Sequence, residues 1–199
     1  MLKIQEELLG LIKKFSGGFG LVGGTAIAFQ IGHRRSIDFD LFTTDDFDND
    51  KVRSVIRETF KIQSTLVEHP GELTLIAGGV KITFYKYPFK IAFSEKFEDI
   101  IKMPNLLTLA AMKAFALGQR AKWKDYADLY FIFKKYSFSE VATKAKELFK
   151  GEFNEKLFRE QLSYFDDIDY SEKVDWLEGF KVGDGVIKEN LKGISLQIA

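Results

Sequence analysis

The chain has 199 residues, of which 46% are hydrophobic, with 29 basic and 29 acidic side chains. This length and apolar content suffice for one domain with a sizeable core, or for one domain with a helical extension. The balanced charge excludes an overall basic field that would attract nucleic acid. A local basic patch could still bind one. Because the sequence contains no cysteine, disulfides, thiolate metal sites and a cysteine nucleophile are excluded.

No signal peptide and no apolar run long enough to span a bilayer is found in the sequence. We therefore expect a cytoplasmic protein without a membrane partner. Glutamine and asparagine are scarce, whereas lysine, glutamate and phenylalanine are plentiful. Such a composition leans towards a thermophilic source.

The first part of the chain reads as a helix, a short strand, a glycine turn and a second helix. The chain opens with apolar residues amid Lys and Glu, which predict an amphipathic helix that ends at Ser16-Gly17-Gly18. These apolar residues are Leu2, Ile4, Leu8, Leu9, Leu11 and Ile12. Residues 19–22 read as a strand, Gly23-Gly24 as a turn, and residues 25–31 as a helix. At such a helix start, free backbone N–H groups point at an anion, so this stretch predicts a phosphate cradle.

Polar and apolar residues then alternate over residues 36–42, just after the basic patch His33-Arg34-Arg35. This alternation predicts a strand with Ile37, Phe39 and Leu41 on its core face.

Two aspartates, Asp38 and Asp40, are therefore expected to project together from the opposite face of that strand. Two carboxylates this close repel each other unless a cation lies between them. Mg²⁺ prefers one or two carboxylates together with phosphate oxygens. A carboxylate pair beside a phosphate cradle thus suits a Mg-nucleotide.

The remaining pattern predicts more strands and then helices. A helix capped by Asp48 or Asn49 is followed by expected strands at 60–67, 72–77, 80–87 and 89–93, with a tight hairpin at Gly78-Gly79. Expected helices cover 106–117, 122–136, 139–149 and 153–164, and Trp176, Leu177 and Phe180 read as anchors of a docked tail. We expect an α+β core over residues 1–102, and a helical region packed on it over residues 103–199.

A second group of charged residues lies in the expected helical region. Lys113, Arg120 and Lys124 share one face if the helix continues, whereas a break at Gly118 leaves Arg120 in a turn. Two readings remain open. Lys113 neutralises the triphosphate of a nucleotide, or Arg120 with the nearby aspartates at 125 and 128 joins two helices.

Taken together, these motifs resemble the polymerase-β-like nucleotidyltransferases, in particular the AbiEii/AbiGii toxin-type branch. The resemblance covers roughly residues 20–135. The first motif runs from Gly23-Gly24-Thr25 to Arg34-x-Ser36-x-Asp38-x-Asp40. The other comprises Lys113, Arg120 and the stretch from Lys124-Asp125-Tyr126 to Asp128-Leu129-Tyr130.

The resemblance implies a nucleotidyltransferase-like mixed β-sheet flanked by helices and a role for each matching residue. Asp38 and Asp40 would bind two Mg²⁺ ions, and Lys113 and Asp125 would join them as catalytic residues. The implied nucleotide-binding residues are Gly23, Gly24, Thr25, Arg34, Arg35 and Ser36. A nucleoside triphosphate would be the substrate, an RNA end, a protein or a small molecule the acceptor, and an antitoxin protein the partner.

The sequence departs from the family pattern at one position. The family normally supplies a third carboxylate from a later strand, and the matching position in residues 80–84 holds Thr83. Three explanations stay open. Asp125 replaces the missing carboxylate, the metal alone activates the acceptor, or the protein binds nucleotides without efficient transfer. A phosphotransferase that moves the γ-phosphate is a further alternative.

Overall fold

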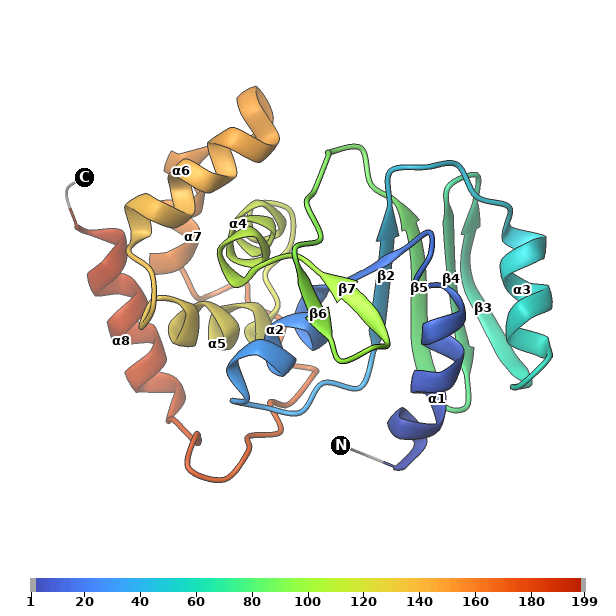
Figure 1. Cartoon of the computed structure of the whole chain (residues 1–199). Coiled ribbons are helices and arrows are strands. Elements are labelled where there is room, and N and C mark those ends of the chain that lie inside the picture. The colour runs from blue at the N-terminus through green and yellow to red at the C-terminus, as the bar shows by residue number, and fades with distance from the viewer. Residues whose placement is uncertain (1–2, 198–199) are drawn as a thin grey trace. The chain divides into compact units, whose positions relative to one another are not determined.

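A five-stranded sheet lies within residues 3–197, the part of the chain that this computed structural model describes. Its strands are β1 (Gly20–Val22), β2 (Phe39–Thr43), β3 (Ile62–His69), β4 (Glu72–Ala77) and β5 (Val80–Lys86), in the spatial order β1-β2-β5-β4-β3 (Figure 1). The β2–β5 pair is parallel and the other pairs are antiparallel. The predicted mixed α+β fold is therefore confirmed.

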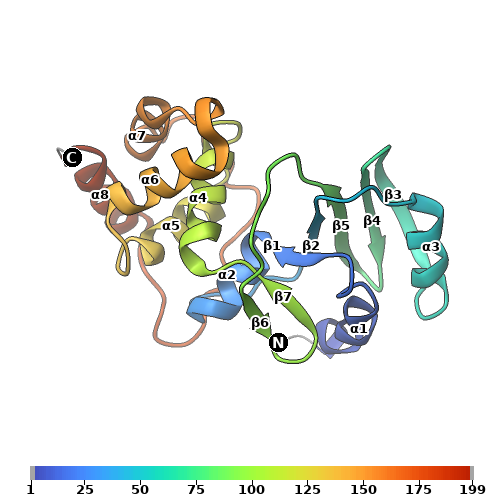
Figure 2. The same cartoon turned by 45° about the horizontal axis from the view of Figure 1, so that its top comes forward.

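Apolar residues on alternate positions give the neighbouring strands β2 and β5 one buried face. Phe39 and Leu41 of β2 and Ile82 and Phe84 of β5 have no exposed surface. Phe15 directly follows α1 (Lys3–Lys14), and its ring lies 4.8 Å from the ring of Phe84. Helix α1 therefore ends against this face of the sheet (Figures 1 and 2).

Two tight turns and a helix cap shape the outer part of the sheet. Gly78 and Gly79 have φ angles of +59° and +75°, which suit the two-residue turn between β4 and β5, so the predicted hairpin is confirmed. The Asp48 carboxylate caps α3 (Asn49–Arg57) by accepting hydrogen bonds from two backbone N–H groups. This helix lies beside β3 and β4.

Two expectations for this part of the chain are wrong. Ile37, expected in the core, is 43% exposed, because β2 begins only at Phe39, the first residue paired with β5. The preceding segment is held instead by the Thr25 hydroxyl, which donates to the backbone carbonyl of Asp38. A strand also fails to form at residues 89–93.

A small hairpin takes the place of that expected strand. Its strands are β6 (Glu95–Phe97) and β7 (Ile101–Met103), which pair only with each other. Before it, the chain turns so that the Phe93 ring covers Gly20, where any added Cβ would collide with that ring. Packing over a glycine of β1 therefore replaces strand pairing here.

The rest of the chain is helical. Its helices are α4 (Leu106–Leu117), α5 (Trp123–Ile132), α6 (Phe138–Phe149), the short 3₁₀ helix η1 (Lys150–Glu152), α7 (Glu155–Ser163) and α8 (Asp184–Ser195). The break after α4 agrees with the turn expected near Gly118. Helix α8 was not predicted, although Ile187, Leu191 and Ile194 have the spacing of one buried helix face. None of the described helices is long and apolar enough to cross a membrane.

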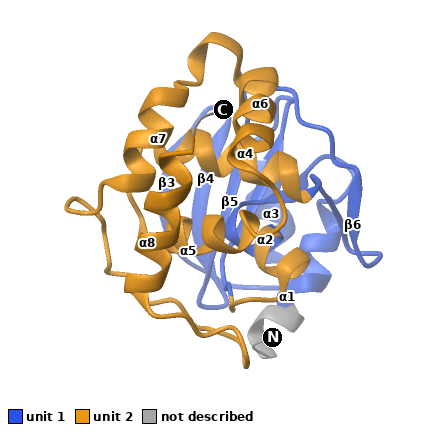
Figure 3. Cartoon of the chain, turned by 90° about the vertical axis from the view of Figure 1, so that its left-hand side faces the viewer, with its two compact units in different colours: residues 1–26, 36–105 blue, residues 27–35, 106–199 orange. Residues whose placement is uncertain are grey.

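The chain divides into two compact units, coloured differently in Figure 3. The first comprises residues 1–26 and 36–105, and the second comprises residues 27–35 and 106–199. Helix α2 (Gly23–Ile31) runs from the first unit into the second. In the second unit, Trp176 and Phe180 pack on Phe131 at ring distances of 5.8 and 5.7 Å, so the predicted docking of the tail is confirmed.

A pair of substitutions tests where β2 begins. Leu41→Ala should lower the free energy of unfolding by about 2–5 kcal/mol, because it leaves a cavity in the core. Ile37→Ala should change it by no more than about 0.5 kcal/mol, because this side chain is exposed. Urea denaturation of both variants measures the difference. Equal losses at both positions would contradict the observed start of the strand.

Candidate functional site

Asp38 and Asp40 lie on the same side of the sheet, opposite the buried Phe39. Asp40 is the register partner of Thr83 on the neighbouring parallel strand β5. The Lys81 Nζ lies 2.9 Å from the Asp38 Oδ2. Lys81 and Thr83 flank the buried Ile82 and therefore share one face of β5. The two carboxylates consequently face the same space above β2 and β5.

Gly23, the first residue of α2, lies directly against Asp40. Gly23 has a φ angle of +70°, and a Cβ added there would collide with the Asp40 carboxylate. Only glycine allows both this backbone conformation and this close approach. The carboxylate is thus held beside the first turn of α2, where free N–H groups favour negative charge.

A hydroxyl hydrogen-bond network joins the start of α2 to the segment that carries Asp38. The buried Thr25 side chain hydrogen-bonds to the Asp38 carbonyl and, at 2.9 Å, to the Ser36 Oγ. Thr25 and Ser36, two predicted nucleotide-binding residues, thus shape the motif itself. Their contacts fix the distance between the glycine turn and Asp38.

The donor atoms at this site fit Mg²⁺. Within the described part of the chain, no cluster of three or more His, Asp or Glu side chains could hold a metal ion, so Asp38 and Asp40 stand as a pair. The Asp38 side chain is 32% exposed, which leaves room for water and phosphate ligands. Mg²⁺ commonly takes one or two carboxylates and completes its shell with water and phosphate oxygens.

A second cluster of charged groups is buried in the helical unit and centres on Asp128 of α5. Its carboxylate accepts hydrogen bonds from the Arg34 Nε at 2.7 Å and the Arg34 Nη2 at 2.9 Å. The His33 Nε2 lies 2.8 Å from the same carboxylate. The Lys113 Nζ lies 2.8 Å from Asp128 and 2.7 Å from Asp125. Three separate segments are therefore joined at one buried point.

The ionisation of these groups follows from their contacts. Burial by itself raises the pKa of Asp128, but the charges of Arg34 and Lys113 and the hydrogen bonds from His33 and Arg34 outweigh it. The pKa of Asp128 therefore lies well below its usual 3.8. Burial lowers the pKa of Lys113, yet Asp125 and Asp128 outweigh that effect and raise it above 10.5. Asp128 and Lys113 thus both carry charge at neutral pH.

These contacts place several predicted site residues in the helical unit. Arg34 and Lys113 are buried and paired with Asp128, whereas the buried Asp125 is paired with Lys113. Arg120 reaches Asp125 with a 3.4 Å ion pair. Such contacts agree with the alternative reading, in which these charges join helices. Arg35 is about half exposed and lies 3.6 Å from Asp175.

Sequence reasoning missed the importance of two residues. Asp128 lies three positions after Asp125, on the same side of α5, and this spacing was a usable signal. Lys81 lies two positions before Thr83, so strand periodicity already places it on the carboxylate face. Its contact with Asp38 depends on the parallel register of β2 and β5, which the sequence does not reveal.

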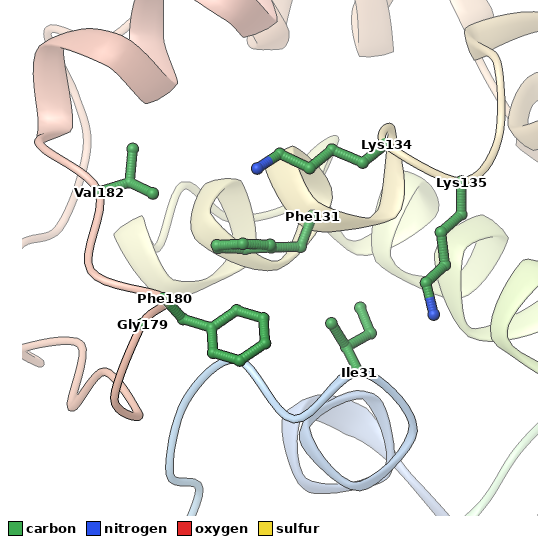
Figure 4. Close-up of a pocket in the computed structure, with 7 residues that line it drawn as sticks. All are labelled: Ile31, Phe131, Lys134, Lys135, Gly179, Phe180 and Val182. Carbon is green, nitrogen blue, oxygen red and sulfur yellow. The ribbon is translucent and has the colours of Figure 1, made fainter.

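A cavity of about 310 Å³ lies elsewhere in the helical unit (Figure 4). Its lining residues are Ile31, Phe131, Lys134, Lys135, Gly179, Phe180 and Val182. The Lys134 ammonium lies over the Phe131 ring, 4.7 Å from its centroid. None of the predicted site residues lines this cavity.

Comparison with known proteins gives consistent matches over most of the chain. The model of the family described as "Nucleotidyl transferase AbiEii toxin, Type IV TA system" matches residues 12–181. An uncharacterized protein of Aquifex aeolicus is 30% identical over 178 aligned residues, and the match covers 84% of this chain and 85% of that protein.

Solved structures resemble the fold at low sequence identity. The nucleotidyltransferase toxin MenT4 of Mycobacterium tuberculosis superposes with a TM-score of 0.63 at 14% identity, over 97% of this chain and 82% of that one. The Helicobacter pylori protein JHP933 superposes with a TM-score of 0.57 at 16% identity, over 96% and 88% of the two chains. These structures share the fold with this chain.

Asp128→Asn should lower the free energy of unfolding by about 3–5 kcal/mol at pH 7, because it leaves two buried cations with only one buried carboxylate. A carboxylate with a depressed pKa stabilises the fold above its unfolded pKa of 3.8, and this contribution is lost as the pH falls through the folded value. The deficit of the variant should therefore shrink below about pH 4.

Urea titrations of both proteins between pH 7 and pH 3 measure this effect. Lys144→Ala is the matched control, because it breaks only the exposed Lys144–Glu147 pair and should cost no more than about 0.5 kcal/mol. A deficit that stays constant down to pH 3 would contradict the assigned ionisation of Asp128.

Proposed function

We propose that this chain, which belongs to the nucleotidyl transferase AbiEii toxin family, transfers a nucleoside monophosphate from a nucleoside triphosphate to a hydroxyl group. One observation carries the proposal. Asp38 and Asp40 share one face of the sheet, and Asp40 lies against the positive-φ glycine turn that begins α2. Carboxylates for a metal and N–H groups for phosphate are thus provided side by side.

In this proposal the residues of the first unit hold the triphosphate and Mg²⁺. Gly23 and Gly24 bind phosphate oxygens through backbone N–H groups, and Asp38 and Asp40 hold the metal. Bound Mg²⁺ would supply positive charge to the phosphate oxygens and to the leaving pyrophosphate. Thr25 holds the Asp38 backbone close to the first turn of α2 through its hydrogen bond to the Asp38 carbonyl.

The reaction is an in-line displacement at the α-phosphorus. The acceptor oxygen forms a bond to that phosphorus while the bond to the β-phosphate oxygen breaks, and pyrophosphate leaves with the bonding electrons. The acceptor also loses a proton. Thr83, opposite Asp40, has a hydroxyl that is no base at neutral pH, so the proton passes to solvent water. We therefore expect slow transfer.

In this proposal the buried charged residues around Asp128 position other parts of the chain and do not touch the substrate. Arg34 and Lys113 are each held by carboxylates of α5, which fixes the segment after α2 to the helical unit. Asp125 remains an alternative base, because its Oδ2 is buried without a hydrogen-bond partner and has only the longer ion pair with Arg120.

An aromatic strip supports an acceptor or substrate that contains a base. Phe42 and Tyr85 follow Asp40 and Thr83 by two residues, so they lie on the same face, and their rings are 5.2 Å apart. Tyr87 adds a third ring at 5.0 Å from Phe42. Aromatic rings bind unpaired bases by stacking. RNA is therefore the first acceptor to test, and an antitoxin protein is the proposed partner.

Asp40→Asn should reduce transfer at least about a hundredfold, because it removes negative charge that holds the metal beside the phosphates. The assay contains Mg²⁺, each labelled nucleoside triphosphate in turn and total RNA, and it measures labelled RNA and released pyrophosphate. Asp46→Asn is the matched control, because Asp46 is 92% exposed and pairs only with Lys86 in a contact of 2.6 Å.

The products separate this proposal from its alternatives. Release of nucleoside diphosphate would indicate a phosphotransferase. Nucleotide binding without either product would indicate a binding module. Full activity of Asp40→Asn would refute the assigned metal site.

Thr83→Asp should raise the transfer rate, because it adds a carboxylate opposite Asp40 that can accept the acceptor proton. General-base catalysis typically contributes about a hundred- to ten-thousandfold, and we expect a measurable part of that factor. Thr83→Asn is the control, because it has nearly the same size and no charge. A fast wild-type protein that Thr83→Asp slows would instead favour another base, such as Asp125.

A further inference from the structure

We propose that the Lys81 ammonium is a fixed positive charge beside the Asp38 and Asp40 carboxylates. It takes the place of one of the two divalent ions that a two-metal site would hold. This inference rests on the proposed function, because it concerns the same site. It predicts that the protein binds its nucleotide with one divalent ion, whereas a site of the two-metal kind holds two.

The first observation is the position of the Lys81 ammonium. Its Nζ lies 2.9 Å from the Asp38 Oδ2, on the side of the sheet that also carries Asp40 and Thr83. The Asp38 oxygen that contacts this ammonium, Oδ2, is one that a second divalent ion would otherwise use. Lys81 and a second divalent ion therefore compete for the same carboxylate.

The second observation is the way the backbone fixes this ammonium. Strand β5 lies inside the sheet, between β2 and β4, and hydrogen-bonds to both. Register pairs Asp40 with Thr83, which places the start of β5 beside Asp38. The Asp38 backbone is held in turn by Thr25. Both partners of the ion pair are thus anchored by neighbouring structure.

The third observation is the charge that these residues leave at the site. A site with a third carboxylate would carry three negative charges. Here Thr83 contributes none, and Lys81 cancels one of the two from Asp38 and Asp40. These four residues therefore carry one net negative charge. Because each divalent ion needs anionic oxygen ligands, this charge suits one ion rather than two.

A second lysine of β5, Lys86, forms an ordinary surface ion pair that can be compared with the Lys81–Asp38 pair. Lys86 pairs with Asp46 at 2.6 Å, but Asp46 is 92% exposed. Asp38 and Lys81 are only 32% and 37% exposed, so water screens their attraction less. Lys86 is therefore a matched control for Lys81.

The test counts bound metal rather than product. Equilibrium dialysis with Mn²⁺ and a non-hydrolysable nucleoside triphosphate analogue gives the ratio of bound Mn²⁺ to bound nucleotide, and electron paramagnetic resonance measures the free Mn²⁺. Wild type should bind one Mn²⁺ per nucleotide. Lys81→Gln should bind two, a twofold rise, because Asp38 becomes available to a second ion.

Two further variants complete the experiment. Lys81→Arg keeps the positive charge and should retain one Mn²⁺ per nucleotide. Lys86→Gln removes a charge from the same strand and should also retain one. Circular dichroism verifies that each variant is folded.

The outcomes separate this inference from the proposed function. Two Mn²⁺ per nucleotide in wild type would overturn the role of Lys81 and leave the proposed nucleotide site intact. An unchanged ratio of one in Lys81→Gln would overturn it as well. A wild-type protein that binds no nucleotide would overturn the proposed function and this inference together.

Discussion

The parallel pairing of β2 with β5 is the constraint on which the candidate site depends. It sets Asp40 opposite Thr83 and brings Lys81 to Asp38, so it decides which charges face the two carboxylates. The same pairing buries the apolar side chains on the opposite face of both strands. Core packing and site geometry are therefore coupled, because a one-residue change in register would expose the core residues and bury the site residues.

The buried charges around Asp128 impose a second constraint, and it acts on the other unit. Asp128 joins the segment after α2 to α4 and α5 through Arg34 and Lys113. The motif that runs from Gly23 to Asp40 is thus divided, since its middle belongs to the helical unit and its two ends belong to the sheet unit. Helix α2 carries the chain from one unit into the other.

Much of the fold could be predicted from local patterns. Strand alternation, the Gly78-Gly79 hairpin and the break after α4 were recognisable because each depends on neighbouring residues. The prediction for Ile37 was wrong, because the alternating pattern extends beyond the start of the strand. The segment before Phe39 is held outside the sheet by hydrogen bonding to Thr25. The site was predictable as a list of residues, whereas their contacts were not. Arg34 and Asp128 are 94 positions apart, and no local pattern reports such a pair.

The sequence by itself determined that Asp38 and Asp40 share one side of their segment, because side chains in an extended chain repeat every two residues. It also determined where the chain turns before the helix, because glycine adopts a positive φ angle without steric cost and Gly23 has such an angle. Only the tertiary structure decided that an ammonium group, Lys81, meets Asp38, and that Arg34 is held by Asp128. The reason is that strand register and burial select partners from distant parts of the chain, and these choices depend on the packing of the whole unit.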